Sequence, residues 1–186
     1  LFAMLVGLLV VPQVHVGSLY TSPEIALVIG NVFAYAISPR VRIFPKLQQK
    51  VKVAASSADF VFVSDKKLVY RPGQYMEWML PHSGIDSRGN RRYFTLASSP
   101  TEATLRLGVK FYEPSSSFKR ELHQITDKTR IIAGQLGGDF TLPKDPAQKI
   151  VFIAGGIGIT PFRSMLKYLI YTDQKRDIVL LDSART

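Results

Sequence analysis

The chain has 186 residues, which allows one medium domain or two small ones, and it carries a formal net charge of +10. It contains no cysteine, which excludes disulfides, cysteine-ligated iron–sulfur clusters and zinc–thiolate centres within these residues; the three histidines lack ligand spacing, so no metal site is predicted. The basic residues form no long run interleaved with stacking aromatics, so nucleic acid is not a predicted partner.

The N-terminal part of the chain is apolar. Residues 1–39 hold one charged side chain, Glu24, and basic residues without an acid among them follow at positions 40, 42, 46, 50 and 52. Ser22, Pro23 and Glu24 are typical of a helix start, and Pro39 is expected to end the helix. An apolar helix flanked by basic residues predicts a membrane span, with the following domain facing the cytoplasm. The alternative is a buried core helix.

From Lys46 the pattern changes to short strands that are separated by turns. Such a series is typical of an antiparallel barrel or sandwich. One amphipathic helix is predicted over residues 117–125. Strands are predicted over residues 50–53, 60–63, 74–80, 91–97, 104–112, 130–133 and 139–142.

The last forty residues have a different pattern. Residues 150–154 form a continuous apolar run, which is typical of a strand covered on both faces. A helix over 161–171 and a second apolar strand over 178–181 complete a βαβ unit. The predicted domains are a membrane segment (1–39), a basic linker (40–45), a β-barrel (46–146) and a partial α/β domain (147–186). The apolar start without methionine and the stop after a strand predict a fragment of a longer protein.

A glycine-rich turn, 155–161 with the sequence GGIGITP, lies between the first apolar strand and its helix. Glycine permits close approach of the backbone to a pyrophosphate, and the helix N-terminus offers free N–H groups and a positive dipole. Thr160 can cap the helix and contact a phosphate. Pro161 takes the place of the third glycine of the usual dinucleotide motif. The alternative is a tight strand-to-helix turn without a ligand.

A second motif, Arg92-Tyr93-Phe94-Thr95, lies on one of the predicted barrel strands. The planar fork of an arginine is suited to a diphosphate, and an aromatic side chain on the same strand can pack on a flavin ring. Arg92 and Phe94 share one face of the strand, whereas Thr95 faces the other way unless the strand kinks. The alternative is an ordinary barrel strand with a surface arginine.

Together these motifs resemble the ferredoxin–NADP⁺ reductase superfamily over residues 46–186. The resemblance implies a Greek-key FAD-binding barrel, followed by the start of an α/β domain that binds NAD(P)H. Phe94 replaces the usual tyrosine of the family, and the phosphate-binding turn is matched only loosely. Hydride transfer requires no acid or base, so no catalytic residue is named. The implied cofactor-binding residues are Arg92, Tyr93, Phe94, Thr95, Val109, Lys110, Ser116, Ser117, Gly155, Gly156, Gly158, Ile159, Thr160 and Pro161.

The segment from Tyr20 to Arg40 is similar to the last membrane helix of the D component of Rnf-type electron-transport complexes. The expected function is therefore a membrane-anchored flavoprotein oxidoreductase that passes electrons between NAD(P)H and an acceptor through FAD. The expected partners are the lipid bilayer and further subunits of a membrane electron-transport complex. The alternatives are the reductase component of an oxygenase or a ferric reductase, and a non-catalytic flavin-binding module.

Overall fold

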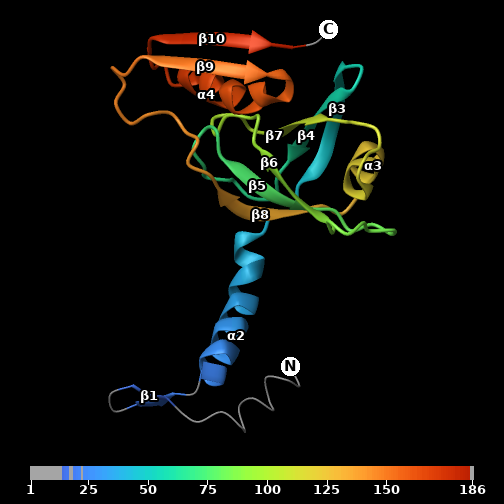
Figure 1. Cartoon of the computed structure of the whole chain (residues 1–186), viewed down its shortest axis with the longest axis vertical. Helices are drawn as coiled ribbons and strands as arrows, with labels where there is room; N and C mark the ends of the chain where they lie inside the picture. Colours follow the sequence, from blue (N-terminus) through green and yellow to red (C-terminus); the bar gives the residue numbers. More distant parts are fainter. Residues whose placement is uncertain (1–13, 17–18, 22, 185–186) are drawn as a thin grey trace. The chain divides into compact units, whose positions relative to one another are not determined.

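The computed structural model describes residues 14–16, 19–21 and 23–184, and its contacts divide the chain into two units, residues 1–42 and 43–186 (Figure 1). In the first unit, β1 (Val14–Val16) pairs antiparallel with β2 (Leu19–Thr21), and α2 (Pro23–Val41) follows. The apolar run 1–11 and the predicted cap Ser22 lie outside the described residues.

The predicted transmembrane helix is wrong. Among the described residues, no helix is both long and apolar enough to cross a bilayer. Between Glu24 and Arg40 the helix spans roughly 22 Å at about 1.5 Å per residue, which is shorter than a hydrocarbon core of about 30 Å. Pro39 does not end the helix as predicted, because α2 continues to Val41. The localisation inferred from this helix, in the membrane with the flavin domain facing the cytoplasm, stays a prediction.

The second unit begins with two three-stranded antiparallel sheets. We call these two sheets and helix α3 the β-domain. One sheet has the order β3 (Lys46–Ala54), β4 (Ser57–Val63) and β7 (Leu105–Lys110). The other has the order β6 (Arg91–Thr95), β5 (Tyr75–Met79) and β8 (Ile132–Gly137). Helix α3 (Ser117–Gln124) lies between β7 and β8 in the chain. The predicted fold class is thus corrected: a transmembrane helix is absent from the described residues, and the strands form two sheets.

Alternating side chains of both sheets build one apolar core. Met76 and Trp78 of β5 are buried, and the Trp78 ring lies 4.9 Å from that of Phe62 on the opposite sheet. Phe118 and Leu122 extend this core from α3. The strand predicted over 139–142 is wrong, because β8 ends at Gly137 and residues 139–142 belong to no strand.

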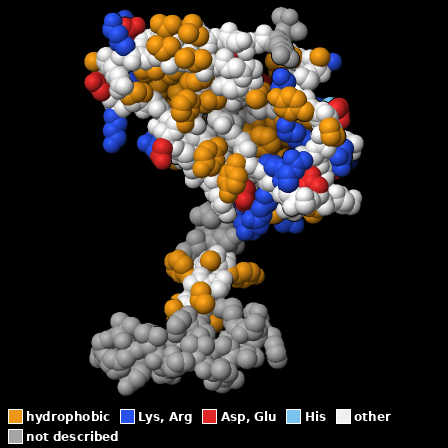
Figure 2. Space-filling model, in the orientation of Figure 1, with side chains coloured by type: hydrophobic (Ala, Val, Ile, Leu, Met, Phe, Trp, Pro, Cys, Tyr) orange, Lys and Arg blue, Asp and Glu red, His pale blue; other side chains and the backbone are white. Residues whose placement is uncertain are grey.

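The chain then forms the βαβ unit, made of β9 (Ile150–Gly155), the short 3-10 helix η1 (Gly156–Ile159), α4 (Thr160–Tyr171) and β10 (Ile178–Ser183). The two strands are parallel, and α4 lies between them and the β-domain (Figure 1). The β9 strand was predicted to be covered on both faces. Instead, Val151 and Ile153 are exposed, and hydrophobic side chains gather over this part of the surface (Figure 2).

Candidate functional site

Strand β6 and helix α3 bring Arg92 and Phe94 of the second motif close to the start of α3. The guanidinium carbon of Arg92 lies 5.4 Å from the ring centroid of Phe118, and the ring of Phe94 lies 5.9 Å from the same ring. Both side chains therefore approach α3 from one face of β6, as expected for residues two apart in a strand. The phenyl ring of Phe94 is half-buried against the core.

The N-terminus of α3 carries two of the predicted serines. The Oγ of Ser116 accepts a hydrogen bond of 3.3 Å from the N–H of Lys119, so Ser116 is the N-cap of the helix. The N–H of Ser117 donates to Oδ2 of Asp86 at 2.9 Å, and the N–H of Asp86 donates to the Oγ of Ser117 at 3.1 Å. A carboxylate of the chain itself thus lies where the positive end of the helix favours an anion.

Asp86 also faces the guanidinium of Arg92. The Nη1 of Arg92 donates to the carbonyls of Arg88 and Gly89 at 2.8 and 3.0 Å, which aims its Nη2 at Oδ1 of Asp86, 3.4 Å away. Hydrogen bonds from the N–H groups of Ser117 and Arg88 hold the pKa of Asp86 below its usual value. No pattern in the sequence indicated a role for Asp86, because its loop has only the features of a turn.

Two lysines add positive charge at the same end of α3. The ammonium of Lys119 donates to the carbonyl of Lys110, and both ammonium groups lie 5.2 Å from the ring of Tyr112. Burial lowers the pKa of Lys119, and the positive charges of Arg88 and Arg92 lower it further. We call Arg88, Arg92, Lys110 and Lys119 the cationic cluster.

Three predicted residues lie apart from this cluster. Tyr93 points away from it; its ring packs edge-on against Tyr75, and its hydroxyl donates to Gln135 at 3.0 Å beside a surface depression of about 500 Å³. Thr95 pairs with Tyr75 at the end of β6. Val109 is buried in the core, so only its backbone could face a ligand. A further depression, of about 700 Å³, is lined by residues 64–68, 70 and 100–105, none of which was predicted.

The glycine-rich turn links β9 to α4 and leaves its glycines open. Gly155 ends β9, and Gly156 has a φ of +53° at the start of η1. A side chain at Gly156 or Gly158 would meet nothing within 4 Å. Thr160 does not cap α4 as expected: its Oγ1 donates to the carbonyl of Ile157 at 3.1 Å. Pro161 lies in the first turn of α4, and Ile159 packs against the core of the βαβ unit.

The turn lies directly against the β-domain at Gly108 of β7. A Cβ atom on Gly108 would lie 2.7 Å from the Cγ2 of Thr160 and 3.2 Å from the Cδ1 of Ile157. The close approach therefore depends on the missing side chain at this position. It brings the glycine-rich turn to the same strand, β7, whose last residue is Lys110 of the cationic cluster.

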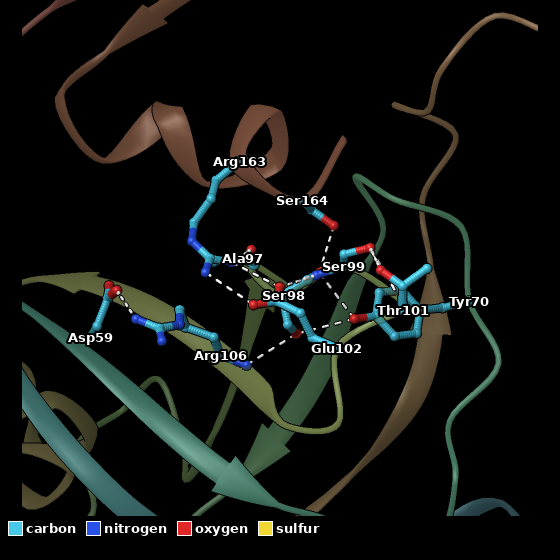
Figure 3. A network of polar contacts seen from close by, with 10 residues as sticks. All are labelled: Asp59, Tyr70, Ala97, Ser98, Ser99, Thr101, Glu102, Arg106, Arg163 and Ser164. Carbon is cyan, nitrogen blue, oxygen red and sulfur yellow. Dashed lines mark hydrogen bonds and ion pairs between the residues drawn. The ribbon is translucent and has the colours of Figure 1, made fainter. Parts of the chain in front are cut away.

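A polar network, which we call the clamp, joins α4 to the segment after β6 (Figure 3). Arg163 donates from Nη1 and Nη2 to the two carboxylate oxygens of Glu102, at 3.0 and 3.1 Å, and from Nη1 to the carbonyl of Ala97. The hydroxyl of Ser164 donates to the carbonyl of Ser98 at 2.6 Å, and both serines are fully buried. Sequence reasoning missed the clamp, because neither segment carries a motif for it.

Two further hydrogen bonds support the clamp. The hydroxyl of Tyr70 donates to the carbonyl of Ser98 at 3.0 Å, and burial raises the pKa of Tyr70 to about 12, so its proton is kept at neutral pH. Glu102 also accepts a hydrogen bond of 2.7 Å from the N–H of Ser99. Burial alone would raise the pKa of Glu102, but the hydrogen bonds from Arg163 and Ser99 outweigh it and lower this pKa.

The lowered pKa predicts how stability depends on pH. Glu102 contributes stability that is fully present above the ordinary pKa of 4.5 and is lost as pH falls through its lower folded value. We expect Glu102→Gln to lose about 1–3 kcal/mol of unfolding free energy at neutral pH, because it leaves the guanidinium of Arg163 without a charged partner. The loss should shrink as pH falls through the lowered pKa of Glu102, because wild-type Glu102 then becomes protonated too. Urea unfolding over a series of pH values measures the loss, and a loss that does not change with pH would contradict the prediction.

Comparison with known proteins shows what this arrangement is similar to. The family described as "Oxidoreductase NAD-binding domain" matches residues 152–186. Over 121 residues the chain is 32% identical to a flavohemoprotein of Halalkalibacterium halodurans. The aligned region covers 62% of this chain and 29% of the relative. The structure is similar to the FAD/NAD-binding domain of nitric oxide dioxygenase from Vibrio cholerae, with a TM-score of 0.66 and 24% identity over 78% of this chain and 63% of that one. The chain is thus similar to FAD- and NAD-binding oxidoreductases in sequence, and to their FAD/NAD-binding domains in fold.

The predicted family resemblance, enzyme class and cofactors FAD and NAD(P)H agree with these similarities. The chain is also 29% identical over 143 residues to the glycine betaine monooxygenase reductase subunit of Chromohalobacter salexigens, covering 73% of this chain. It spans only 29% and 38% of the length of the two curated relatives. The similarity of Tyr20–Arg40 to the D component of Rnf-type complexes stays a prediction.

Proposed function

We propose that this chain is the part of an NAD(P)H oxidoreductase that binds FAD and the nicotinamide nucleotide. One observation carries the proposal: the glycine-rich turn packs on β7 at Gly108, in the same unit that presents the cationic cluster. Two groups of donors suited to phosphates thus belong to one unit. In such an enzyme a hydride leaves the nicotinamide, which is oxidised, and reduces the flavin, whose electrons then pass to an acceptor.

The residues around α3 fit the diphosphate of FAD. Arg92 offers a planar fork, Ser116 and Ser117 offer the start of a helix, and the lysines of the cationic cluster add charge. In our proposal these groups bind the diphosphate, and Phe94 packs against the flavin. Asp86 already uses the N–H of Ser117, so a diphosphate at this N–H would take its place.

The glycine-rich turn fits the pyrophosphate of NAD(P)H. The open space at Gly156 and Gly158 leaves the backbone accessible, and the N-terminus of α4 lies directly after it. The side chain of Thr160, which belongs to this turn, lies close to Gly108 of β7, and this contact would keep the nucleotide close to the β-domain.

The acceptor of the electrons is a separate question. The relationship to a monooxygenase reductase subunit favours an oxygenase component as the acceptor. Membrane electron-transport subunits as the acceptor, a ferric reductase activity and a non-catalytic flavin-binding role are the rival expectations.

The proposal predicts that the full-length protein is yellow when purified. NADH or NADPH should reduce the bound flavin and remove the colour when oxygen is excluded. The measurement is the visible spectrum before and after anaerobic mixing with each nucleotide, and wild type then reveals which nucleotide is preferred. A folded protein that is colourless and takes up no added FAD would exclude the cofactor assignment. A yellow protein that neither nucleotide reduces would favour the non-catalytic flavin-binding module.

A further inference from the structure

The clamp joins the two segments that directly follow the cofactor motifs along the chain. On the β-domain side, Ala97 and Ser98 follow Thr95, the last residue of the flavin motif, by two and three positions. On the other side, Arg163 and Ser164 follow Thr160 by three and four positions, which is one turn of α4. The clamp therefore connects the strand of one motif to the helix of the other with few residues between.

The geometry of the clamp fixes orientation as well as distance. Arg163 spans both carboxylate oxygens of Glu102 and a backbone carbonyl, so its guanidinium plane is held by three acceptors. Both side chains are largely shielded, with 27% and 16% of their surface exposed. The second bond, from Ser164 to Ser98, is a separate contact between α4 and the same segment.

Transfer of a hydride is sensitive to small displacements. Reacting atoms must approach to about 3–3.5 Å, and a misplacement of about 1 Å can cost roughly a hundredfold in rate. Helix α4 begins at the proposed nucleotide site, so a shift of α4 on the β-domain moves the nucleotide relative to the flavin. The contact at Gly108 limits approach but does not set the angle of the helix.

We propose that Arg163, through Glu102 and Ala97, is a positioning residue that holds the nicotinamide in register with the flavin. This inference rests on the proposed function. It concerns the alignment of the two cofactors and not the binding of either one, because neither Arg163 nor Glu102 belongs to the proposed cofactor contacts.

The test uses the full-length protein with FAD bound and the variants Arg163→Ala, Arg163→Lys and Glu102→Gln. Stopped-flow mixing with a range of NAD(P)H concentrations separates the apparent dissociation constant from the limiting rate of flavin reduction. For Arg163→Ala and Glu102→Gln we expect FAD content and dissociation constant within about twofold of wild type and a limiting rate at least about tenfold lower. Arg163→Lys should be intermediate, because an ammonium cannot replace the planar fork. The double variant should be no slower than the slower single one, since both act through one contact.

Glu77→Gln is the matched control. Glu77 is shielded to a similar extent, at 14% exposure, and pairs with Arg91 between β5 and β6, entirely within the β-domain. It should keep the wild-type limiting rate. If the clamp variants also keep the wild-type limiting rate, the positioning role is wrong while the proposed function stands. The same holds if they lose affinity for FAD or for the nucleotide while the limiting rate of flavin reduction is unchanged. If Arg163→Ala does not fold, the same criteria apply to Arg163→Lys and Glu102→Gln. Wild type that neither NADH nor NADPH reduces would overturn the proposed function and this inference together.

Discussion

Arg92→Ala is expected to weaken FAD binding by about 1.5–3 kcal/mol, or roughly 10- to 150-fold, the range for hydrogen bonds to a charged group. The side chain of Arg92 is held by the carbonyls of its own turn and lies over Phe118 at the start of α3. Its removal takes away the planar donor that the cationic cluster presents beside the helix N-terminus. Titration of the flavin-free protein with FAD, followed by flavin fluorescence, measures the loss.

Arg91→Ala is the control for Arg92→Ala. Arg91 is the neighbour on the same strand, and its guanidinium lies half-exposed beside Glu77, 3.4 Å from the carboxylate. It has the same formal charge but is outside the cationic cluster, so its loss should change FAD affinity by less than about threefold. Equal effects of the two substitutions would mean that overall charge, and not the geometry at α3, governs the binding.

Gly156→Val is expected to slow flavin reduction by NAD(P)H at least tenfold, about 1.4 kcal/mol in the barrier, without loss of FAD. Gly156 has a φ of +53°, which a branched side chain rarely adopts, and the space beside it is open to a ligand. The valine would fill the surface that a pyrophosphate must approach. Because the turn and the cationic cluster are built from different elements, the variant should stay yellow.

Gly84→Val is the control variant for the effect of backbone strain alone. Gly84 has a similar φ of +65° and equally open space, but it lies in the loop after β5, away from the glycine-rich turn. Both variants should lose comparable stability on heating, and only Gly156→Val should lose the rate of flavin reduction. If the rate is unchanged in Gly156→Val, the turn has no part in nucleotide binding.

Local patterns predicted the strands well where each strand has a buried face. Strand β5 alternates Met76 and Trp78 inward, which the sequence signals by its spacing and by the Pro72-Gly73 turn before it. The strand predicted over 139–142 has similar local chemistry, but this segment pairs with no strand and instead packs Phe140 against Phe162 of α4. Pairing is a tertiary property, so spacing alone could not decide this case.

The candidate site was predictable where its residues belong to a continuous motif. Arg92 and Phe94 are two apart on one strand, and the strand geometry brings both to α3. Asp86 and the pair of Glu102 with Arg163 depend on loops that meet across many residues, and no spacing records such contacts. For α2, the basic flank and the apolar run after Glu24 favoured a membrane span, but the helix is not both long and apolar enough to cross a bilayer.

Because Asp86 lies at the start of α3, binding of an anionic ligand there would be an exchange of one anion for another. The helix end and Arg92 already hold an anion that belongs to the chain. A diphosphate arriving there exchanges one anion for another, so part of its attraction is offset by the release of the Asp86 carboxylate into water. Such an exchange releases fewer counterions from solution than binding to uncompensated cations does, because Asp86 already neutralises part of the charge. Binding at this helix end would then depend less steeply on salt than the four positive charges of the cationic cluster suggest.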